Sequence, residues 1–359
     1  MIYLDYHAAT PLSEAAREAM ARALNEGFGN ASSAHRAGRN ARGFTEAARD
    51  GVATALGGSP ADVVLTSGGT EACQLMVRGM PRPTQVITGA LEHPAIVAAC
   101  DAWKADGVEV RVVDVEVELE LPAGALVALQ WVNHETGRIA SIERWAARCK
   151  AAGATLVVDA IQAFGRIPID VSALGAHALA VASHKVGGPC AGAVWVARDV
   201  DLQPQLGGGG QERGRRGGSQ DAVGHAGFAA ACGAIETRLE AMETVARWRD
   251  DLEAVLVELG ASINDEDRPR VASVVDASVP GWRGEVLVAA LDLEGVCASA
   301  GAACSSGVQA ASPVLQAIYP EEPWRATSAL RLSLGPESLD DAAIATAIET
   351  LRRVVPRKG

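Results

Sequence analysis

Apolar residues follow two alternating patterns along the first two thirds of the chain. They recur at helical spacing in three segments, residues 13–24, 94–107 and 142–153. Continuous apolar and β-branched runs, typical of buried strands, occupy residues 61–69, 109–115, 124–133, 155–162 and 176–185. Strands of this kind joined by helices predict a mostly parallel sheet with helices on both faces. We therefore expect an α/β domain.

The pattern changes at about residue 236. Residues 235–260 predict one long amphipathic helix that bridges two domains. It is followed by strand patterns at 270–278 and 329–335 and by helical patterns at 284–295 and 341–355. We predict a large domain over residues 14–245 and a smaller α+β domain formed by residues 1–13 and 246–359.

Polar residues directly follow several of the predicted strands. They are Ser67 to Glu71, then Asn133 and His134, then Asp159 and Gln162, and finally His184 and Lys185. In open α/β sheets ligands bind beyond the carboxyl ends of the strands. The sequence therefore predicts a ligand site where these side chains gather.

Composition limits the classes of function. The 359-residue chain is 48% hydrophobic, as globular proteins are, and its net charge of −12 disfavours direct binding to nucleic acid. It has no run of about 18 apolar residues, so we expect no membrane span. The first residues lack a basic stretch followed by an apolar one, so we expect no signal peptide and a cytoplasmic protein.

The seven cysteines do not suggest a metal or disulfide framework. Their number is odd, and no two of them stand in a C-x-x-C spacing. We therefore expect no zinc site and no disulfide scaffold, and one cysteine remains a candidate nucleophile.

A lysine at the sheet edge fits the requirements of pyridoxal phosphate. That cofactor needs a lysine amine for a Schiff base, a carboxylate at its ring nitrogen, and backbone N–H groups at a helix N-terminus for its phosphate. Lys185, Asp159 and the turn at Gly69 and Thr70 match these needs. Each has an ordinary alternative: a solvated lysine, a helix cap and a simple glycine turn.

Further residues would complete such a site. His93, before a helix-starting proline, would stack on the ring, although a lone histidine there is more often part of a capped loop. Gln162 could donate to the ring hydroxyl, and Asn133 could lie beside it.

Ten segments together carry a resemblance to a known family. In chain order they are LDYHAATP, GNASSAHRAGR, TSGGTEA, LEHPAI, WVNHETG, VDAIQAFGRIPIDV, SHKVGGP, GGGGQERGRRGGS, SAGAACSSG and LRLSLG. The chain resembles the cysteine desulfurases of the class V aminotransferase group, in their longer-loop type. The resemblance implies the PLP-dependent transferase fold type I with a seven-stranded sheet. It also implies a homodimer, L-cysteine as substrate, and a sulfur-acceptor protein that is a scaffold or carrier.

The resemblance also assigns roles to individual residues. Ser219 would reach the phosphate bound by the partner subunit, and Arg331 would bind the substrate carboxylate beside Asn133. Ser183 and His184 would contact the cofactor next to Lys185. Cys304 would be the nucleophile, and Cys297, on a more apolar segment, is the weaker candidate.

The implied reaction converts L-cysteine to L-alanine. The Lys185 amine or a nearby group removes the Cα proton, and His93 moves protons around substrate and product. The Cys304 thiolate attacks the substrate sulfur and becomes a persulfide, which is passed to an acceptor.

Four positions depart from the usual family pattern. Ala182 replaces a serine that often binds phosphate, so Ser183 could compensate, while Gln211 stands where a histidine is common. His7 and His134 replace a small residue and an asparagine. Since the sequence ends soon after LRRVVPRKG, we expect no C-terminal tail of the kind with which some members dock an iron–sulfur scaffold. The acceptor thus stays open between iron–sulfur clusters, thiolated tRNA and a specialised metabolite.

Two alternatives remain beside the desulfurase. One is a PLP-dependent lyase or epimerase of the same fold that does not use Cys304. The other is a non-catalytic sulfur-relay or assembly partner.

Overall fold

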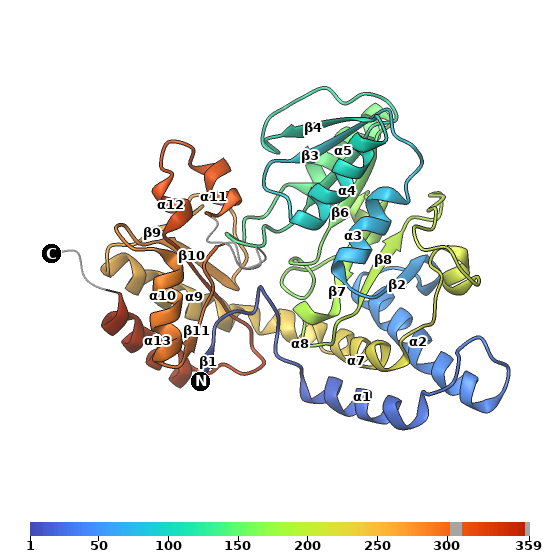
Figure 1. Cartoon of the computed structure of the whole chain (residues 1–359), viewed down its shortest axis with the longest axis horizontal. Coiled ribbons are helices and arrows are strands. Elements are labelled where there is room, and N and C mark those ends of the chain that lie inside the picture. Colours follow the sequence, from blue (N-terminus) through green and yellow to red (C-terminus); the bar gives the residue numbers. More distant parts are fainter. Residues whose placement is uncertain (302–310, 356–359) are drawn as a thin grey trace. The chain divides into compact units, whose positions relative to one another are not determined.

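A computed structural model describes residues 1–301 and 311–355 of the chain (Figure 1). The chain divides into two compact units. The first, here called the sheet unit, comprises Leu12–Trp131 and Ala140–Glu236. The second, called the terminal unit, comprises Met1–Pro11, Val132–Ile139 and Thr237–Gly359. The short segment 132–139, which follows a strand of the sheet unit, is thus grouped with the terminal unit.

The sheet unit is built on seven strands in the order β2-β8-β7-β6-β5-β3-β4. In chain order they are β2 Val63–Thr66, β3 Gln85–Gly89, β4 Glu109–Val113, β5 Leu126–Gln130, β6 Thr155–Asp159, β7 Ala178–Ala182 and β8 Gly192–Val196. Only β8 is antiparallel to its neighbours, β2 and β7. The prediction of a mostly parallel seven-stranded α/β sheet is confirmed.

The strands explain the continuous apolar runs. Every residue of β2, β5, β7 and β8 is buried, because helices cover both faces of the sheet. β4 is an edge strand, and three of its five residues are exposed. The sheet core therefore centres on β5 to β8.

Helices of the sheet unit form layers over the strands (Figure 1). In chain order they are α1 Glu14–Glu26, α2 Arg36–Ala55, α3 Gly69–Arg78, α4 Pro94–Ala105, α5 Ile142–Ala152, α6 Val171–Leu174 and α7 Ala222–Gly233. α3 and α4 share one core with apolar residues of six strands. α5 packs on β6, and α7 packs against α1 and α2. Ser13 caps α1 by accepting a hydrogen bond from the N–H of Ala16.

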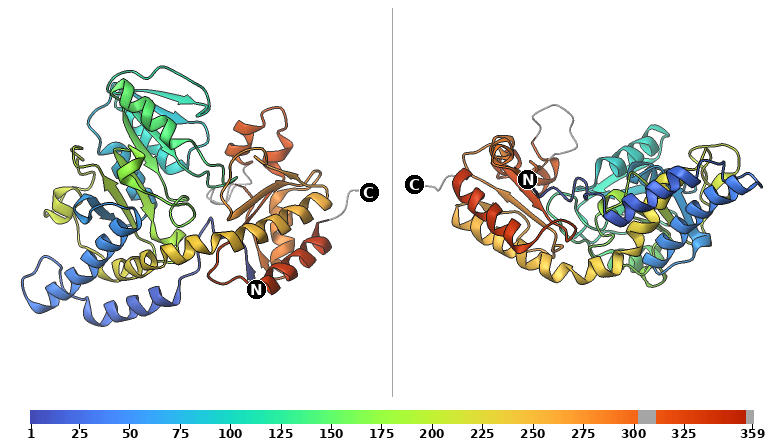
Figure 2. Two further views of the ribbon diagram at one scale, coloured as in Figure 1. Left: turned by 180° about the vertical axis from the view of Figure 1, so that it is seen from behind. Right: turned by 90° about the horizontal axis from the view of Figure 1, so that it is seen from below.

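The terminal unit contains two small sheets and three main helices. Strands β12 Ala329–Ser333, β10 Val274–Ser278 and β9 Ser262–Ile263 form an antiparallel sheet in that order, and β1 Ile2–Tyr3 pairs in parallel with β11 Val296–Cys297. Helices α9 Met242–Glu258, α10 Gly284–Leu293 and α13 Asp341–Val354 enclose one apolar core with them. Figure 2 shows α9 and α13 side by side. Short helices α11 Pro313–Ile318 and α12 Trp324–Thr327 complete the unit.

The long helix predicted over residues 235–260 is two segments, α8 Ile235–Glu240 and α9. Ala241 separates them but keeps near-helical angles, with φ −71° and ψ −12°, so the break is slight. Among the residues described, no helix combines the length and the apolar character needed to cross a membrane.

Candidate active site

The carboxyl ends of six strands lie at one edge of the sheet. β3 to β7 are parallel, and β2 runs in the same direction as β7 because β8 reverses between them. The segments that follow β2, β6 and β7 carry most of the predicted site residues. The topology therefore brings these segments to a common edge.

Lys185 lies in a short 3-10 turn, Ser183–Lys185, directly after β7. The strand pattern predicted β structure up to Lys185, whereas the strand ends at Ala182. The cause is the Ser183 carbonyl, which accepts from the N–H groups of Val186 at 3.0 Å and Gly188 at 3.1 Å and so turns the chain. Lys185 is half-buried at this turn.

Asp159, the last residue of β6, is a buried acid. Its Oδ1 accepts from the N–H of Ile161 at 2.9 Å, and the Cys73 thiol also hydrogen bonds to the carboxyl. Burial raises the pKa of Asp159, while His93, these hydrogen bonds and Lys185 act in the opposite direction. An acid so placed is suited to pair with a cationic group.

His93 is the N-cap of α4, and Pro94 follows it at the first helical position. Its Nδ1 accepts from the N–H of Ala95 at 3.1 Å, so the neutral ring carries its proton on Nε2. Burial lowers the pKa of His93, and Lys185 lowers it further, while Asp159 raises it. His93, Asp159 and Lys185 are thus close enough to interact electrostatically. The helix-cap alternative for His93 holds, and the cap leaves Nε2 for other contacts.

The first turn of α3 is suited to bind an anion. No side chain caps this ten-residue helix, because its N-cap is Gly68. A Cβ on Gly69 would lie 2.7 Å from Cδ1 of Ile161 and 3.3 Å from Cβ of Ala182. A side chain at position 69 would crowd Ile161 and Ala182, so glycine lets the helix start lie against the end of β7 and the turn after β6. Free N–H groups and the helix dipole favour an anion there.

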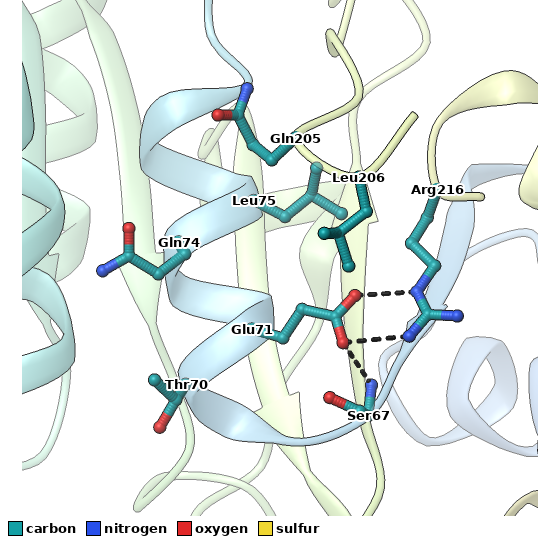
Figure 3. A pocket seen from close by; sticks show the side chains of 8 residues that line it. All are labelled: Ser67, Thr70, Glu71, Gln74, Leu75, Gln205, Leu206 and Arg216. Carbon is teal, nitrogen blue, oxygen red and sulfur yellow. Dashed lines mark hydrogen bonds and ion pairs between the residues drawn. The ribbon is translucent and has the colours of Figure 1, made fainter. Parts of the chain in front are cut away.

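A hollow of about 450 Å³ adjoins this helix start. Figure 3 shows its lining: Ser67, Thr70, Glu71, Gln74, Leu75, Gln205, Leu206 and Arg216. Glu71 accepts from the N–H of Ser67 at 2.8 Å and from Arg216 Nε at 2.7 Å. Although burial opposes it, these contacts lower the pKa of Glu71. Thr70 thus belongs to the lining of this hollow.

Three other predicted residues of the sheet unit are at the same strand ends. Ser183 is fully buried, and its Oγ, which has no hydrogen-bond partner in the described part of the chain, faces Gly188. The pKa of His184 is lowered to about 4 by burial and by Lys185, Arg166 and His93. Gln162 is buried in the turn after β6.

Ser219 is exposed on a loop that a buried ion pair between Glu212 and Arg49 holds in place. Glu212, seven residues earlier, accepts from Arg49 Nη1 at 2.7 Å and Nη2 at 3.0 Å, and from the N–H of Leu65 at 2.8 Å. Both charged side chains of this pair are buried. Glu212 also has φ 49°, a left-handed angle that costs a non-glycine residue free energy. Sequence reasoning missed this pair, although the glutamate in a glycine-rich segment was the available signal.

Arg331 and Asn133 belong to the terminal unit. Arg331, on β12, is 3% exposed and donates to the carbonyl of His134 at 3.0 Å and to Oδ1 of Asp5 at 2.9 Å. Asn133 Oδ1 accepts from the N–H groups of Glu135 and Thr136, both at 2.9 Å. Sequence reasoning missed Asp5, which holds the arginine.

His7, one of the four positions that depart from the usual family pattern, also belongs to the terminal unit. It is buried, and its ring nitrogens lie 3.0 Å from Ser273 Oγ and 3.3 Å from the His134 carbonyl. His7 and Arg331 therefore contact the same carbonyl. Its ring supports the turn that carries His134, which explains why a larger residue is accommodated at position 7.

Cys304 falls in 302–310, outside the described residues. Cys297 is half-buried on β11, and burial and Asp292 raise the pKa of its thiol. A raised pKa disfavours the thiolate, so Cys297 is a poor nucleophile. Within residues 1–301 and 311–355, no three or more His, Cys, Asp or Glu side chains are grouped to hold a metal.

The donor set of the sheet unit fits pyridoxal phosphate. A lysine amine, an imidazole and a buried carboxyl interact at the sheet edge, and an uncapped helix N-terminus lies against two of the same segments. Asp159 would hold the ring nitrogen, and the start of α3 would hold the phosphate.

Comparisons with known proteins agree with this geometry. The family described as aminotransferase class-V matches residues 2–341. An "IscS-like cysteine desulfurase" of Mycobacterium tuberculosis is 36% identical over 99% of this chain and 97% of its own. A solved "NifS-like protein" has a TM-score of 0.90 at 27% identity, covering 98% of each chain. A structure of "SspA in complex with cysteine" has a TM-score of 0.81 at 26% identity, covering 94% of this chain and 100% of that one.

Proposed function

The chain belongs to the class V aminotransferase family and, within it, to the cysteine desulfurases, and on this premise we propose how its residues convert L-cysteine to L-alanine. In the proposed reaction the C–S bond of L-cysteine breaks and an S–S bond forms on an enzyme thiol. L-Cysteine and the thiol thus become L-alanine and an enzyme persulfide, with one proton delivered to carbon.

One observation carries the proposal: Lys185, His93 and the buried Asp159 interact at the sheet edge, next to the uncapped start of α3. This combination offers a primary amine, a proton carrier, an anion and an anion-binding helix end. Pyridoxal phosphate, when bound, supplies a ring that accepts the electron pair left when a bond at Cα breaks.

The chain's own residues would hold that cofactor in stated ways. Asp159 places a negative charge at the ring nitrogen. The N–H groups of Gly69 and Thr70 and the Thr70 hydroxyl would bind the phosphate, and the Lys185 amine would hold the aldehyde group. Gln162 donates to the ring hydroxyl. Ser183 and His184, which flank Lys185, belong to the same proposed binding set.

Proton movement falls to two groups. We assign removal of the Cα proton to the Lys185 amine, which is the primary amine of this donor set. His93 carries its proton on Nε2, and its lowered pKa keeps the ring neutral near pH 7, so Nε2 donates and recovers a proton. Its tie to Ala95 fixes the ring in one orientation for that task.

Arg331 and Asn133 are the proposed contacts of the substrate carboxylate. An arginine binds a carboxylate with two parallel N–H bonds, which fixes the orientation of an amino acid. Asp5 and the His134 carbonyl hold the guanidinium from other sides. The structure titled as SspA with cysteine supports L-cysteine as the substrate class.

Cys304 is the proposed nucleophile toward the substrate sulfur. The persulfide then passes to an acceptor protein, a scaffold or carrier. We also propose a homodimer in which Ser219 contacts the phosphate bound by the partner. The exposure of Ser219, on a loop fixed at Glu212, supports that role.

Purified protein incubated with L-cysteine tests the proposal. We expect equal amounts of alanine and of enzyme-bound persulfide in a single turnover, and Cys304→Ala should stop both. Alanine or another product formed at full rate by Cys304→Ala would favour a lyase or epimerase. Borohydride reduction and peptide mapping should place the pyridoxyl group on Lys185, and any other position contradicts the proposed site.

A further inference from the structure

A buried carboxyl group precedes His93. Glu92 is 7% exposed and lies in the turn between β3 and α4. Its Oε2 accepts from the N–H of Gln130 at 2.7 Å, and the backbone of Gly89 provides a second hydrogen bond. The carboxyl thus ties the turn that carries His93 to the ends of two strands.

The strand register places this carboxyl beside Asp159. β3 pairs with β5 only as far as Thr88 and Ala128, and beyond that point Glu92 supplies the acceptor for the Gln130 N–H. Gln130 is the register partner of Asp159 on β6. Neighbouring strands are about 4.8 Å apart. Glu92 is therefore bound to the residue next to Asp159.

The charges around the two acids differ. Asp159 is the charged group that acts on Glu92, and the described residues form no ion pair with Glu92. Asp159 interacts instead with His93, Lys185 and the Cys73 thiol. Two neighbouring buried carboxyls do not both ionise readily, and the one that lies beside an amine ionises first. Burial and Asp159 raise the pKa of Glu92 well above its usual range.

We infer that Glu92 is a positioning residue that, as an uncharged carboxylic acid, ties the turn carrying His93 to the end of β5 and leaves Asp159 as the only anion of the pair. This role rests on the proposed function only through the tasks given to His93 and Asp159. Its charge state can be measured independently of any reaction.

Infrared difference spectroscopy tests the charge state. Holoenzyme labelled with ¹³C at glutamate carboxyl groups is compared with its E92Q variant at pH 7. We expect the variant to lose a band of the protonated carboxyl and to keep every carboxylate band. The exposed Glu109→Gln is the matched control and should lose a carboxylate band instead. Loss of a carboxylate band in E92Q overturns the inference.

Turnover tests the positioning role. An amide can replace a neutral carboxylic acid as an acceptor, so E92Q should form alanine within about threefold of the parent rate. E92A leaves the Gln130 N–H without an acceptor and should lose about tenfold or more. The pH profile of E92Q should match that of the parent.

Failure of E92Q to fold, or a loss equal to that of E92A, contradicts the inference, because an amide that replaces a neutral carboxylic acid should keep the hydrogen bond from the Gln130 N–H. If the parent itself forms no alanine, the proposed function fails, while the infrared result still decides the charge state of Glu92.

Discussion

The two units hold their charged site residues in different ways. In the sheet unit, Asp159 and His93 each accept from an N–H group two residues further along the chain. In the terminal unit, Arg331 is held by Asp5, 326 positions away, and by the His134 carbonyl, 197 positions away. One arrangement is local in sequence and the other depends on the whole fold of its unit.

This difference teaches where a site is vulnerable. A locally tied side chain keeps its orientation as long as its own strand end and helix start form. A side chain tied across the unit loses its orientation when any of the distant segments moves. We therefore expect substitutions in the sheet unit to act on chemistry, and those in the terminal unit to act on binding and on stability.

The largest effect should come from Asp159→Ala. It removes the buried anion beside His93 and Lys185, and breaking a buried charge interaction costs about 3–5 kcal/mol, which corresponds to about 10²- to 10⁴-fold if it is lost in full from the rate. The measurement is kcat/KM for alanine formation. The exposed Asp170→Ala, which removes the cap of α6, is the control and should leave the rate unchanged. An unchanged rate in Asp159→Ala would contradict the expectation that substitutions in the sheet unit act on chemistry.

Arg331→Lys should have the next largest effect, on KM for L-cysteine. A lysine cannot form two parallel bonds to a carboxylate, so we expect KM to rise about 10- to 100-fold with a smaller change in kcat. Asp5→Asn keeps the arginine but weakens its tie, and should raise KM by about tenfold or less. A fall in kcat alone, in either variant, contradicts the assignment to binding.

Glu135 makes the stability of the terminal unit depend on pH. Burial and Asp276 raise its pKa from 4.5 to about 8, so the folded state holds a proton that the unfolded state releases. Stability from this group is complete below pH 4.5 and is lost as pH rises towards 8, by at most about 1.4 kcal/mol per pH unit. Urea unfolding of parent and Glu135→Gln at pH 6, 7 and 8 measures it. Equal slopes in the two proteins would contradict the prediction.

The smallest effect should follow from Ser13→Ala. It removes the cap of α1, where Oγ lies 3.2 Å from the N–H of Ala16, and should cost about 1 kcal/mol of unfolding free energy. Alanine formation should not change, because this cap lies outside the proposed site. A loss of activity without a loss of stability would show that α1 matters to the reaction directly.

Sequence alone predicted five of the seven strands of the sheet unit from their apolar and β-branched runs. It missed α2, whose segment contains three glycines and many polar residues. Low intrinsic propensity is overcome there by packing on α7, where a Cβ on Gly51 would approach that of Cys232 to 3.1 Å. β3 and β8 were missed as individual strands, although β8 is buried throughout and β3 in four of its five residues.

The residues of the candidate site also differ in how well the sequence predicts them. Lys185, Asp159 and His93 could be located because each directly follows a strand or starts a helix. Glu92 and the Arg49–Glu212 pair could not, since a charged residue that is buried in the fold looks like a solvated one in the sequence. Their burial depends on contacts 38 and 163 positions apart.

The absence of a side chain at Gly69 allows a short distance between the start of α3 and its neighbours Ile161 and Ala182. The helix start lies against Ile161, which follows Asp159, and against Ala182, which precedes the turn with Lys185, so a larger residue at position 69 would have to displace these neighbours or α3. A ligand that places an anionic group at the start of α3 and a carbonyl group at the Lys185 amine must have these two groups at the distance that separates the two sites. Selection among phosphorylated aldehydes would then depend on the packing of α3 against Ile161 and Ala182 as well as on individual hydrogen bonds.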